Sequence, residues 1–380
     1  MAHVFIVSKI TFKYHLEYQF AGTGAGDVST DFIFDAKIKL NTQDEKRSVG
    51  MITDVSRIKK GDKILFFVTG ISKFFGIFEA ESEFFLDPND PDNYLVNELG
   101  KILTYRILIK PYKVYKKGIT EYDCLDSLKN VTYPDEICWS LIYRKLGGNR
   151  GCTMITDQEY NNLVAKLSKN NELLNGTNYS FDSTNNEIIE THNPYLYTGR
   201  KIDIVENLKN NLLNRYSNKK AFEHYIQYFV VLLLKSKESD KILNSTSTVN
   251  WIGNEVMCSF GEHRIDAFAI QETANHVEIT LIELKDEKIQ EYIKYQIEGY
   301  LNWLTDYILP YYLRKNKTIT IHPIIISDGI PNSRRSTKLK LETLENEVIN
   351  YDWNKYQSDQ ITISKTKIIH FNDDNGDLIF

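Results

Sequence analysis

The second half of the chain alternates between apolar runs with helical spacing and runs that suit buried strands. Ala221–Lys235 is long and apolar, and Lys288–Leu304 carries apolar residues close to the spacing of a helix face. Between them, Gly261–Asp266 and Val277–Lys285 have the pattern of two strands, joined through the polar loop Gln271–His276. This order predicts an α/β region in which helices flank an antiparallel strand pair.

The strand Val277–Lys285 has an unusual composition on one side. Residues in a strand alternate between faces, so three apolar residues and then Glu283 and Lys285 share one face. Burying a lone charge is costly, and buried charges are therefore usually paired or hold a metal. Glu283-Leu284-Lys285 taken alone is also compatible with a strand end that turns out to solvent.

An antiparallel return would place Asp266 beside Glu283, with Lys285 at the edge of the two carboxylates. Paired carboxylates suit a hard divalent cation, and such a cation activates water for phosphodiester hydrolysis. The predicted strand Thr318–Ser327 alternates and then becomes continuously apolar, which favours a buried position next to the strand of Glu283.

The order of these features resembles the PD-(D/E)XK nuclease superfamily, most of all its endonuclease S and restriction-endonuclease branches. The match rests on a helix with Glu223, a strand with Asp266, a strand with Glu283 and Lys285, and a helix with Gln296. It covers roughly residues 200–330 and lacks the proline that is common before the aspartate. The resemblance implies a mixed central sheet and Mg²⁺ held by the Asp and the Glu, with Mn²⁺ as a substitute.

The same resemblance, together with the chemistry of the side chains, suggests a role for each residue. Lys285 would position or help deprotonate the attacking water and offset charge on the phosphate. Glu223 would complete the outer shell of the metal site, and Gln296 would orient Lys285 or a water. His263 would lie on the opposite face of the strand, as a structural residue or a phosphate contact.

Residues 1–167 are richer in strand patterns than in helix patterns. Short strands with intervening turns predict a small barrel, and the strands are expected at Val4–Ser8, Lys63–Val68, Lys73–Ala80 and Arg106–Val114. Thr156 begins a Thr-x-x-Glu capping box, and the helix that it opens would face inward through Leu163 and Leu167.

Four segments of this region resemble the EVE domain of the PUA-like superfamily, a relative of the YTH domains. They are Gly61–Phe67, Phe75–Phe78, Trp139–Leu146 and Gly148–Gly151. The resemblance implies a β-barrel with flanking helices that binds a nucleic-acid base, in some members a modified base flipped into an aromatic pocket.

Aromatic walls can replace the stacking that a flipped base loses. The candidate base-binding residues are Phe74, Phe75, Tyr105, Trp139 and Tyr143. The neighbouring cations Arg144, Lys145 and Arg150 are candidates for phosphate contacts. Trp139 and Tyr143 are at helical spacing, so they are equally compatible with a place in the core.

Composition limits the classes of function. The chain has 380 residues, enough for two or three domains, and a formal net charge of −5, so nucleic-acid binding would need local basic patches. Its 4 cysteines form no CxxC pair, which argues against a zinc site and a disulfide framework and fits a reducing cytoplasm. No signal peptide and no membrane-spanning run is apparent.

The sequence therefore predicts an α+β protein with a base-reading domain at 1–167, an Asn-rich linker at 168–193 and a nuclease domain at 194–380. The predicted activity is Mg²⁺-dependent cleavage of double-stranded DNA by a restriction-type defence enzyme. Cutting both strands usually needs two active sites, so a homodimer is expected. The alternatives are a ribonuclease or RNA-processing enzyme and a non-catalytic nucleic-acid-binding protein. The three charges Asp266, Glu283 and Lys285 argue against the last.

Overall fold

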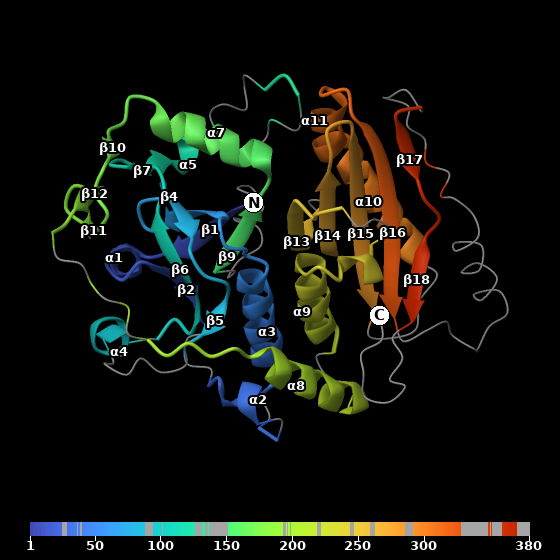
Figure 1. The fold of residues 1–380 in the computed structure, drawn as a ribbon, viewed down its shortest axis with the longest axis horizontal. Coiled ribbons are helices and arrows are strands. Elements are labelled where there is room, and N and C mark those ends of the chain that lie inside the picture. The colour runs from blue at the N-terminus through green and yellow to red at the C-terminus, as the bar shows by residue number, and fades with distance from the viewer. Residues whose placement is uncertain are drawn as a thin grey trace. The chain divides into compact units, whose positions relative to one another are not determined.

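The computed structural model divides the chain into two compact units (Figure 1). Unit 1 comprises Met1–Thr132 and Glu136–Asn214, and unit 2 comprises Tyr133–Asp135 and Arg215–Phe380. The residues that the structure describes are 1–24, 29–35, 37–38, 40–87, 94–100, 102–125, 131–133, 136, 151–192, 195, 197, 199–218, 222–243, 247–258, 263–285, 292–327, 349, 351 and 359–370.

Unit 1 is built on a curled eight-stranded mixed sheet with the strand order β2-β6-β4-β3-β1-β9 (Figure 1). These six strands are β1 (Ala2–Val7), β2 (Phe20–Thr23), β3 (Lys63–Val68), β4 (Lys73–Ala80), β6 (Tyr105–Pro111) and β9 (Cys152–Ile155). The short strands β5 (Phe85–Leu86) and β8 (Ile119–Thr120) pair with β6 and β4. The bounds of β3 and β4 coincide with the predicted runs, because both are continuous β-prone segments that end at turns.

Helices surround this sheet. They are α1 (Lys9–Glu17), α2 (Asp31–Phe34), α3 (Thr42–Ser56), α4 (Tyr94–Leu99), α5 (Glu121–Leu125) and α7 (Asp157–Ser168). The capping box predicted at Thr156 is confirmed, since its side chain accepts from the backbone of Glu159 and the Glu159 side chain accepts from the backbone of Thr156. Leu163 and Leu167 are fully buried, as predicted for the inner face of α7.

Of the segment 168–193, expected to be a linker, the described residues 168–192 are instead packed into unit 1. The segment contains β10 (Leu173–Leu174), which pairs with β7 (Val114–Tyr115), and the hairpin of β11 (Tyr179–Asp182) and β12 (Glu187–Glu190). Phe181 packs edge-on against Phe12 and Phe75, and Ser180 donates to Glu17 at 2.6 Å. The asparagines therefore belong to connections within a domain, and the alternating aromatic residues hold the strands against the core.

This packing leads to a prediction about proteolysis. Residues 168–190 should resist limited digestion with a non-specific protease, because their backbone is paired in strands and Phe181 is held in the core. Mass spectrometry of the fragments from the full chain tests the prediction. Early cleavage within 168–190 would show that the segment opens independently of unit 1.

Unit 2 contains a six-stranded sheet with the order β13-β14-β15-β16-β17, in which β18 also pairs with β16. The strands are β13 (Trp251–Met257), β14 (Arg264–Glu272), β15 (His276–Lys285), β16 (Thr318–Ser327), β17 (Ile361–Ile363) and β18 (Lys367–His370). β13, β14 and β15 are antiparallel neighbours, whereas β16 runs parallel to β15, so this sheet is mixed as predicted. The bounds of β16 and its place beside β15 are confirmed.

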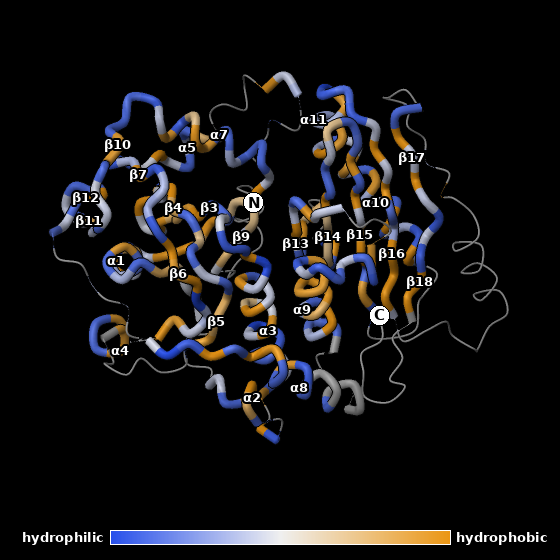
Figure 2. The backbone as a smooth tube through the Cα atoms, viewed as in Figure 1, coloured by the Kyte–Doolittle hydropathy of each residue, from blue (hydrophilic) through white to orange (hydrophobic). Residues whose placement is uncertain are grey.

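Two of the described helices of unit 2, α9 (Phe222–Lys235) and α10 (Ile293–Trp303), follow the predicted apolar runs. The described part of unit 2 also contains α11 (Leu309–Leu313), a 3₁₀ turn at Ser239–Lys241 and a π-helical turn at Leu304–Ile308. α9 is largely hydrophobic along its length (Figure 2) and packs against β13, β14 and β15. Helix α8 (Val205–Asn218) crosses the division between the two units.

None of the helices in the described part of the chain combines the length and the apolar character that a membrane crossing needs.

Candidate active site

Two carboxylates meet where β14 and β15 lie side by side. The strands pair in antiparallel register, with Ala267 opposite Ile282, so Asp266 and Glu283 are opposite each other one step further along. Asp266 is 9% exposed and Glu283 is 3% exposed. This confirms the prediction that the hairpin brings the two acids together, and their burial excludes a strand end that turns out to solvent.

Backbone contacts fix the position of Asp266. Its carboxylate Oδ2 accepts a hydrogen bond of 2.7 Å from the backbone N–H of Leu284. Its backbone carbonyl accepts a bond of 2.9 Å from Nε2 of Gln227, a buried residue of α9. The aspartate is therefore tied both to the strand of Glu283 and to the helix that packs on the sheet.

A third acid lies on the other side of Asp266. The register of β13 and β14 places Glu255 opposite Asp266, and Glu255 has a φ of 51°, in the left-handed region that non-glycine residues rarely adopt. Gln227 donates to Glu255 Oε1 at 3.0 Å, and Arg264 bonds to its Oε2 at 3.0 Å. These two partners hold the glutamate in its uncommon conformation, which costs roughly 1–2 kcal/mol.

Glu283 is held through both carboxylate oxygens. Lys285 Nζ bonds to Oε1 at 2.5 Å, and the hydroxyl of Tyr300 bonds to Oε2 at 2.5 Å. Tyr300 also contacts the backbone carbonyl of Arg264 at 2.9 Å, so helix α10 is connected to both strands. Charge-assisted bonds of this kind are stronger than neutral ones and orient the carboxylate.

The electrostatics of the cluster are unbalanced toward negative charge. Burial, and after it the charges of Glu283 and Glu223, raise the pKa of Asp266 well above its usual 3.8. The pKa of Lys285 is raised although burial lowers it, because Glu283 and the other acids favour the cation. In the absence of a metal, Lys285 is therefore a cation at neutral pH, which suits it to neutralise phosphate charge.

These residues fit a hard divalent cation on chemical grounds. Two buried carboxylates offer oxygen ligands, and a bound cation would offset the burial and the neighbouring acids that raise the pKa of Asp266. Mg²⁺ keeps several waters and needs only one or two protein carboxylates. Within the described residues, no group of three or more His, Cys, Asp and Glu side chains is arranged to hold a metal, so Asp266 and Glu283 would bind it with water.

The structure also shows where the other predicted catalytic residues lie. Glu223 is in the first turn of α9, and its charge raises the pKa of both Asp266 and Lys285, so it belongs to the cluster. Gln296 is on α10, four residues before Tyr300. No hydrogen bond joins Gln296 to Lys285 among the described contacts, and Lys285 donates to Glu283 instead.

The predicted base-binding aromatic residues of unit 1 that the structure describes do not line an open pocket. Phe74 and Phe75 are 0% exposed and Tyr105 is 1% exposed. Phe74 packs on Phe67 at 4.8 Å between ring centroids, and Phe75 packs on Phe12 at 5.2 Å. Phe74 and Phe75 point to opposite faces of β4, and both faces are covered, so both phenylalanines lie in the core.

The remaining residues predicted for base and phosphate binding lie outside the described residues. They are Trp139, Tyr143, Arg144, Lys145 and Arg150. Their predicted roles therefore stay predictions.

Sequence reasoning assigned no role to three residues that shape the site. They are Tyr300 and Gln227, which bond to β15 and β14 from two helices, and Glu255, which bonds to β14 from a neighbouring strand. The weak signals for them were Gln227, a polar residue within the apolar run of α9, and Tyr300, which shares a helix face with Gln296.

Among known proteins, similarity to this chain is found only in solved structures. No protein family and no curated protein matches the chain. A protein of Rhodopseudomonas palustris is 12% identical, covering 44% of this chain and 92% of its own, with a TM-score of 0.24. A Pseudomonas syringae protein is 14% identical, covering 44% and 99%, with a TM-score of 0.27.

The human THYN1 protein in complex with 5-methylcytosine containing DNA is 11% identical. The match covers 44% of this chain and 98% of THYN1, with a TM-score of 0.25. Scores this low do not establish a common fold, so the function of this chain has to be argued from its own site.

Proposed function

We propose that the chain is a metal-dependent endonuclease that hydrolyses phosphodiester bonds. The observation that supports this best is the buried pair Asp266 and Glu283 on neighbouring strands, with the Lys285 cation bonded to Glu283. A buried cluster with an excess of acids and a strongly raised carboxyl pKa is costly for stability and is typical of functional sites.

Each residue of the cluster has a role that follows from its contacts. Asp266 and Glu283 would hold Mg²⁺, and Mn²⁺ offers the same preference for oxygen ligands. When bound, the ion supplies Lewis-acid stabilisation of phosphoryl charge and a more acidic water. Lys285 offsets the negative charge that develops on the phosphate. Tyr300 and the N–H of Leu284 keep the two carboxylates oriented.

We further propose that the substrate is double-stranded DNA and that unit 1 selects it by reading a modified base, as part of a restriction-type enzyme. The support is the similarity of the segments Gly61–Phe67 and Phe75–Phe78, with Trp139–Gly151, to EVE domains. Cleavage of both strands by one type of site calls for a homodimer.

The test is digestion of matched DNA duplexes that carry methylated, hydroxymethylated or unmodified cytosine, and of the corresponding RNA. Cutting should need Mg²⁺, and Glu283→Gln should slow it by roughly 100-fold or more, because it removes a charged ligand. The matched control is Glu278→Gln, on the opposite face of β15, which should retain activity. Equal activity of Glu283→Gln and the native chain would disprove the assigned site, and cutting confined to RNA would disprove the substrate.

A further inference from the structure

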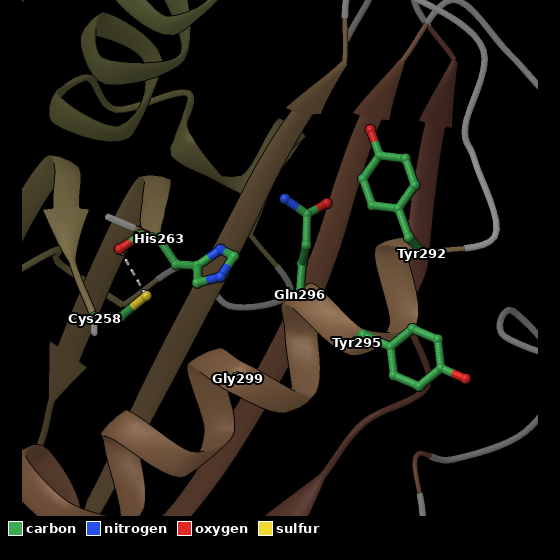
Figure 3. A pocket seen from close by; sticks show the side chains of 6 residues that line it. All are labelled: Cys258, His263, Tyr292, Tyr295, Gln296 and Gly299. Carbon is green, nitrogen blue, oxygen red and sulfur yellow. Dashed lines mark hydrogen bonds between the residues drawn. The ribbon is translucent and has the colours of Figure 1, made fainter. Parts of the chain in front are cut away.

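A cavity opens beside the carboxylate cluster, between the end of β13, the start of β14 and helix α10 (Figure 3). Its volume is about 270 Å³, and it is lined by Cys258, His263, Tyr292, Tyr295, Gln296 and Gly299. Helix α10 connects the cavity to the cluster, because Gln296 lines the cavity and Tyr300, one helical turn further along, bonds to Glu283. The proposed catalytic acids therefore lie about one helical turn from the cavity lining.

Two tyrosines at the start of α10 remain unusually exposed. Tyr292 is 51% exposed and Tyr295 is 74% exposed, although both line the cavity. They are three residues apart and so lie on neighbouring parts of one helix face. Their rings offer flat apolar surface that the described part of the protein leaves largely uncovered, and a planar aromatic ligand could stack on it.

Gly299 lies on the same helix face and keeps the cavity open. A glycine inside a helix destabilises the helix relative to an alanine, so a glycine at such a position calls for an explanation. A Cβ at Gly299 would meet no heavy atom within 4 Å, so the protein's own packing does not require a glycine. A larger side chain at this position would instead occupy the space that the cavity provides.

The cavity also contains hydrogen-bonding groups. The Oε1 atom of Gln296 is buried and has no hydrogen-bond partner among the described residues. The imidazole of His263 points toward the side chain of Gln296 across the cavity (Figure 3). An unpartnered buried carbonyl is unfavourable, and a ligand N–H would satisfy it. The edge of a nucleic-acid base carries such groups beside a stackable ring.

We propose that this cavity holds one unpaired base of the nucleic-acid substrate next to the phosphate that is cut, stacked on Tyr292 and Tyr295 and hydrogen-bonded by Gln296. The proposal rests on the proposed nuclease function. A volume of about 270 Å³ is below the roughly 300–1,000 Å³ of pockets for whole drug-sized ligands, which favours a single ring system. Stacking on aromatic side chains also tolerates any base sequence.

The experiment measures binding, not cleavage. The full chain carrying Glu283→Gln is titrated without Mg²⁺, so that cutting is suppressed, with DNA duplexes that contain one unpaired adenine and with duplexes in which that adenine is replaced by an abasic site. The position of the unpaired residue is moved along the duplex. At the position that reaches the cavity, loss of the base should weaken binding by about tenfold, as expected for lost stacking.

Filling the cavity should remove this difference. In Gly299→Leu, and in the double variant Tyr292→Leu with Tyr295→Leu, the duplexes with and without the base should bind equally well. The matched control is Gly50→Leu, because Gly50 lies within helix α3 and a Cβ there also meets no heavy atom within 4 Å. Thermal melting of each variant checks that the fold persists.

The outcomes separate this proposal from the nuclease function. If Gly299→Leu keeps the full preference for the unpaired base while the native chain cuts DNA, the cavity proposal is wrong and the nuclease proposal stands. The cavity proposal also fails if no position of the adenine gives a difference. If the chain neither binds nor cuts nucleic acid, both proposals fail.

Discussion

Replacing Asp266 with asparagine is expected to abolish cleavage and, at the same time, to raise the melting temperature of the protein at neutral pH. The carboxylate is nearly buried beside Glu283, and its pKa is raised mainly by burial and by the neighbouring acids. Asparagine has the same shape, can still accept the bond from Leu284 N–H, and carries no charge. The variant loses a metal ligand and also an unfavourable buried charge.

The pH dependence of this effect has a definite sign. A carboxyl whose pKa is raised by folding holds its proton more tightly in the folded state, so its contribution to stability is fully present below 3.8. That contribution is lost as the pH rises through the raised pKa of the folded state. The advantage of Asp266→Asn should therefore be largest at neutral and alkaline pH and should shrink toward zero in acid.

Calorimetry of the native chain and the variant across this pH range tests the prediction. A gain of about 1 kcal/mol moves the melting temperature of a domain of 150–250 residues by roughly 2–4 °C. Added Mg²⁺ should raise the melting temperature of the native chain more than that of Asp266→Asn, because ligand binding stabilises the folded state. Asp240→Asn, an exposed acid in the same unit, is the control. A variant that melts lower than the native chain at pH 8 would show that the ionised Asp266 stabilises the fold.

Replacing Asp87 with alanine is expected to destabilise unit 1 by about 3–5 kcal/mol, the usual cost of breaking a buried ion pair. The side chains of Asp87 and Arg106 are both 0% exposed, and Arg106 Nη1 bonds to Asp87 Oδ2 at 2.8 Å. The same oxygen accepts a bond of 2.6 Å from the hydroxyl of Tyr197. The alanine variant leaves a buried guanidinium without this carboxylate and removes one of the hydrogen-bond partners of Tyr197.

Amide hydrogen exchange in β6, followed with calorimetry of the full chain, measures this loss. Glu172→Ala provides the control: its bridge to Lys116 is 3.1 Å long, but the two side chains are 63% and 35% exposed. Solvent screens such a pair, so its loss should cost at most about 1 kcal/mol. An equally small effect for Asp87→Ala would mean that Arg106 is held by its other contacts, the carbonyls of Ile102 and Leu103.

The corrections to the sequence predictions have a common origin in packing between distant segments. Phe74 and Phe75 have the composition of a base-binding surface, but a strand covered on both faces buries consecutive residues. The Asn-rich stretch 168–193 has the composition of a linker, but Phe181 inserts beside Phe12, far away in sequence. The composition of a segment does not reveal which distant segment of the chain packs against it.

The sequence by itself indicated helices α9 and α10, a strand at each of the two acids and the proximity of Asp266 and Glu283, whereas the extent of β14 from Arg264 to Glu272 was not predicted. Strand alternation and hairpin pairing are local properties of the chain. The two-residue alternation of side chains and one antiparallel hairpin were therefore sufficient to predict that the two acids meet. Only the tertiary structure decided how the carboxylates are held and charged. Tyr300 reaches Glu283 from another element, and burial raises the pKa of Asp266, both of which depend on how α9, α10 and the sheet pack together.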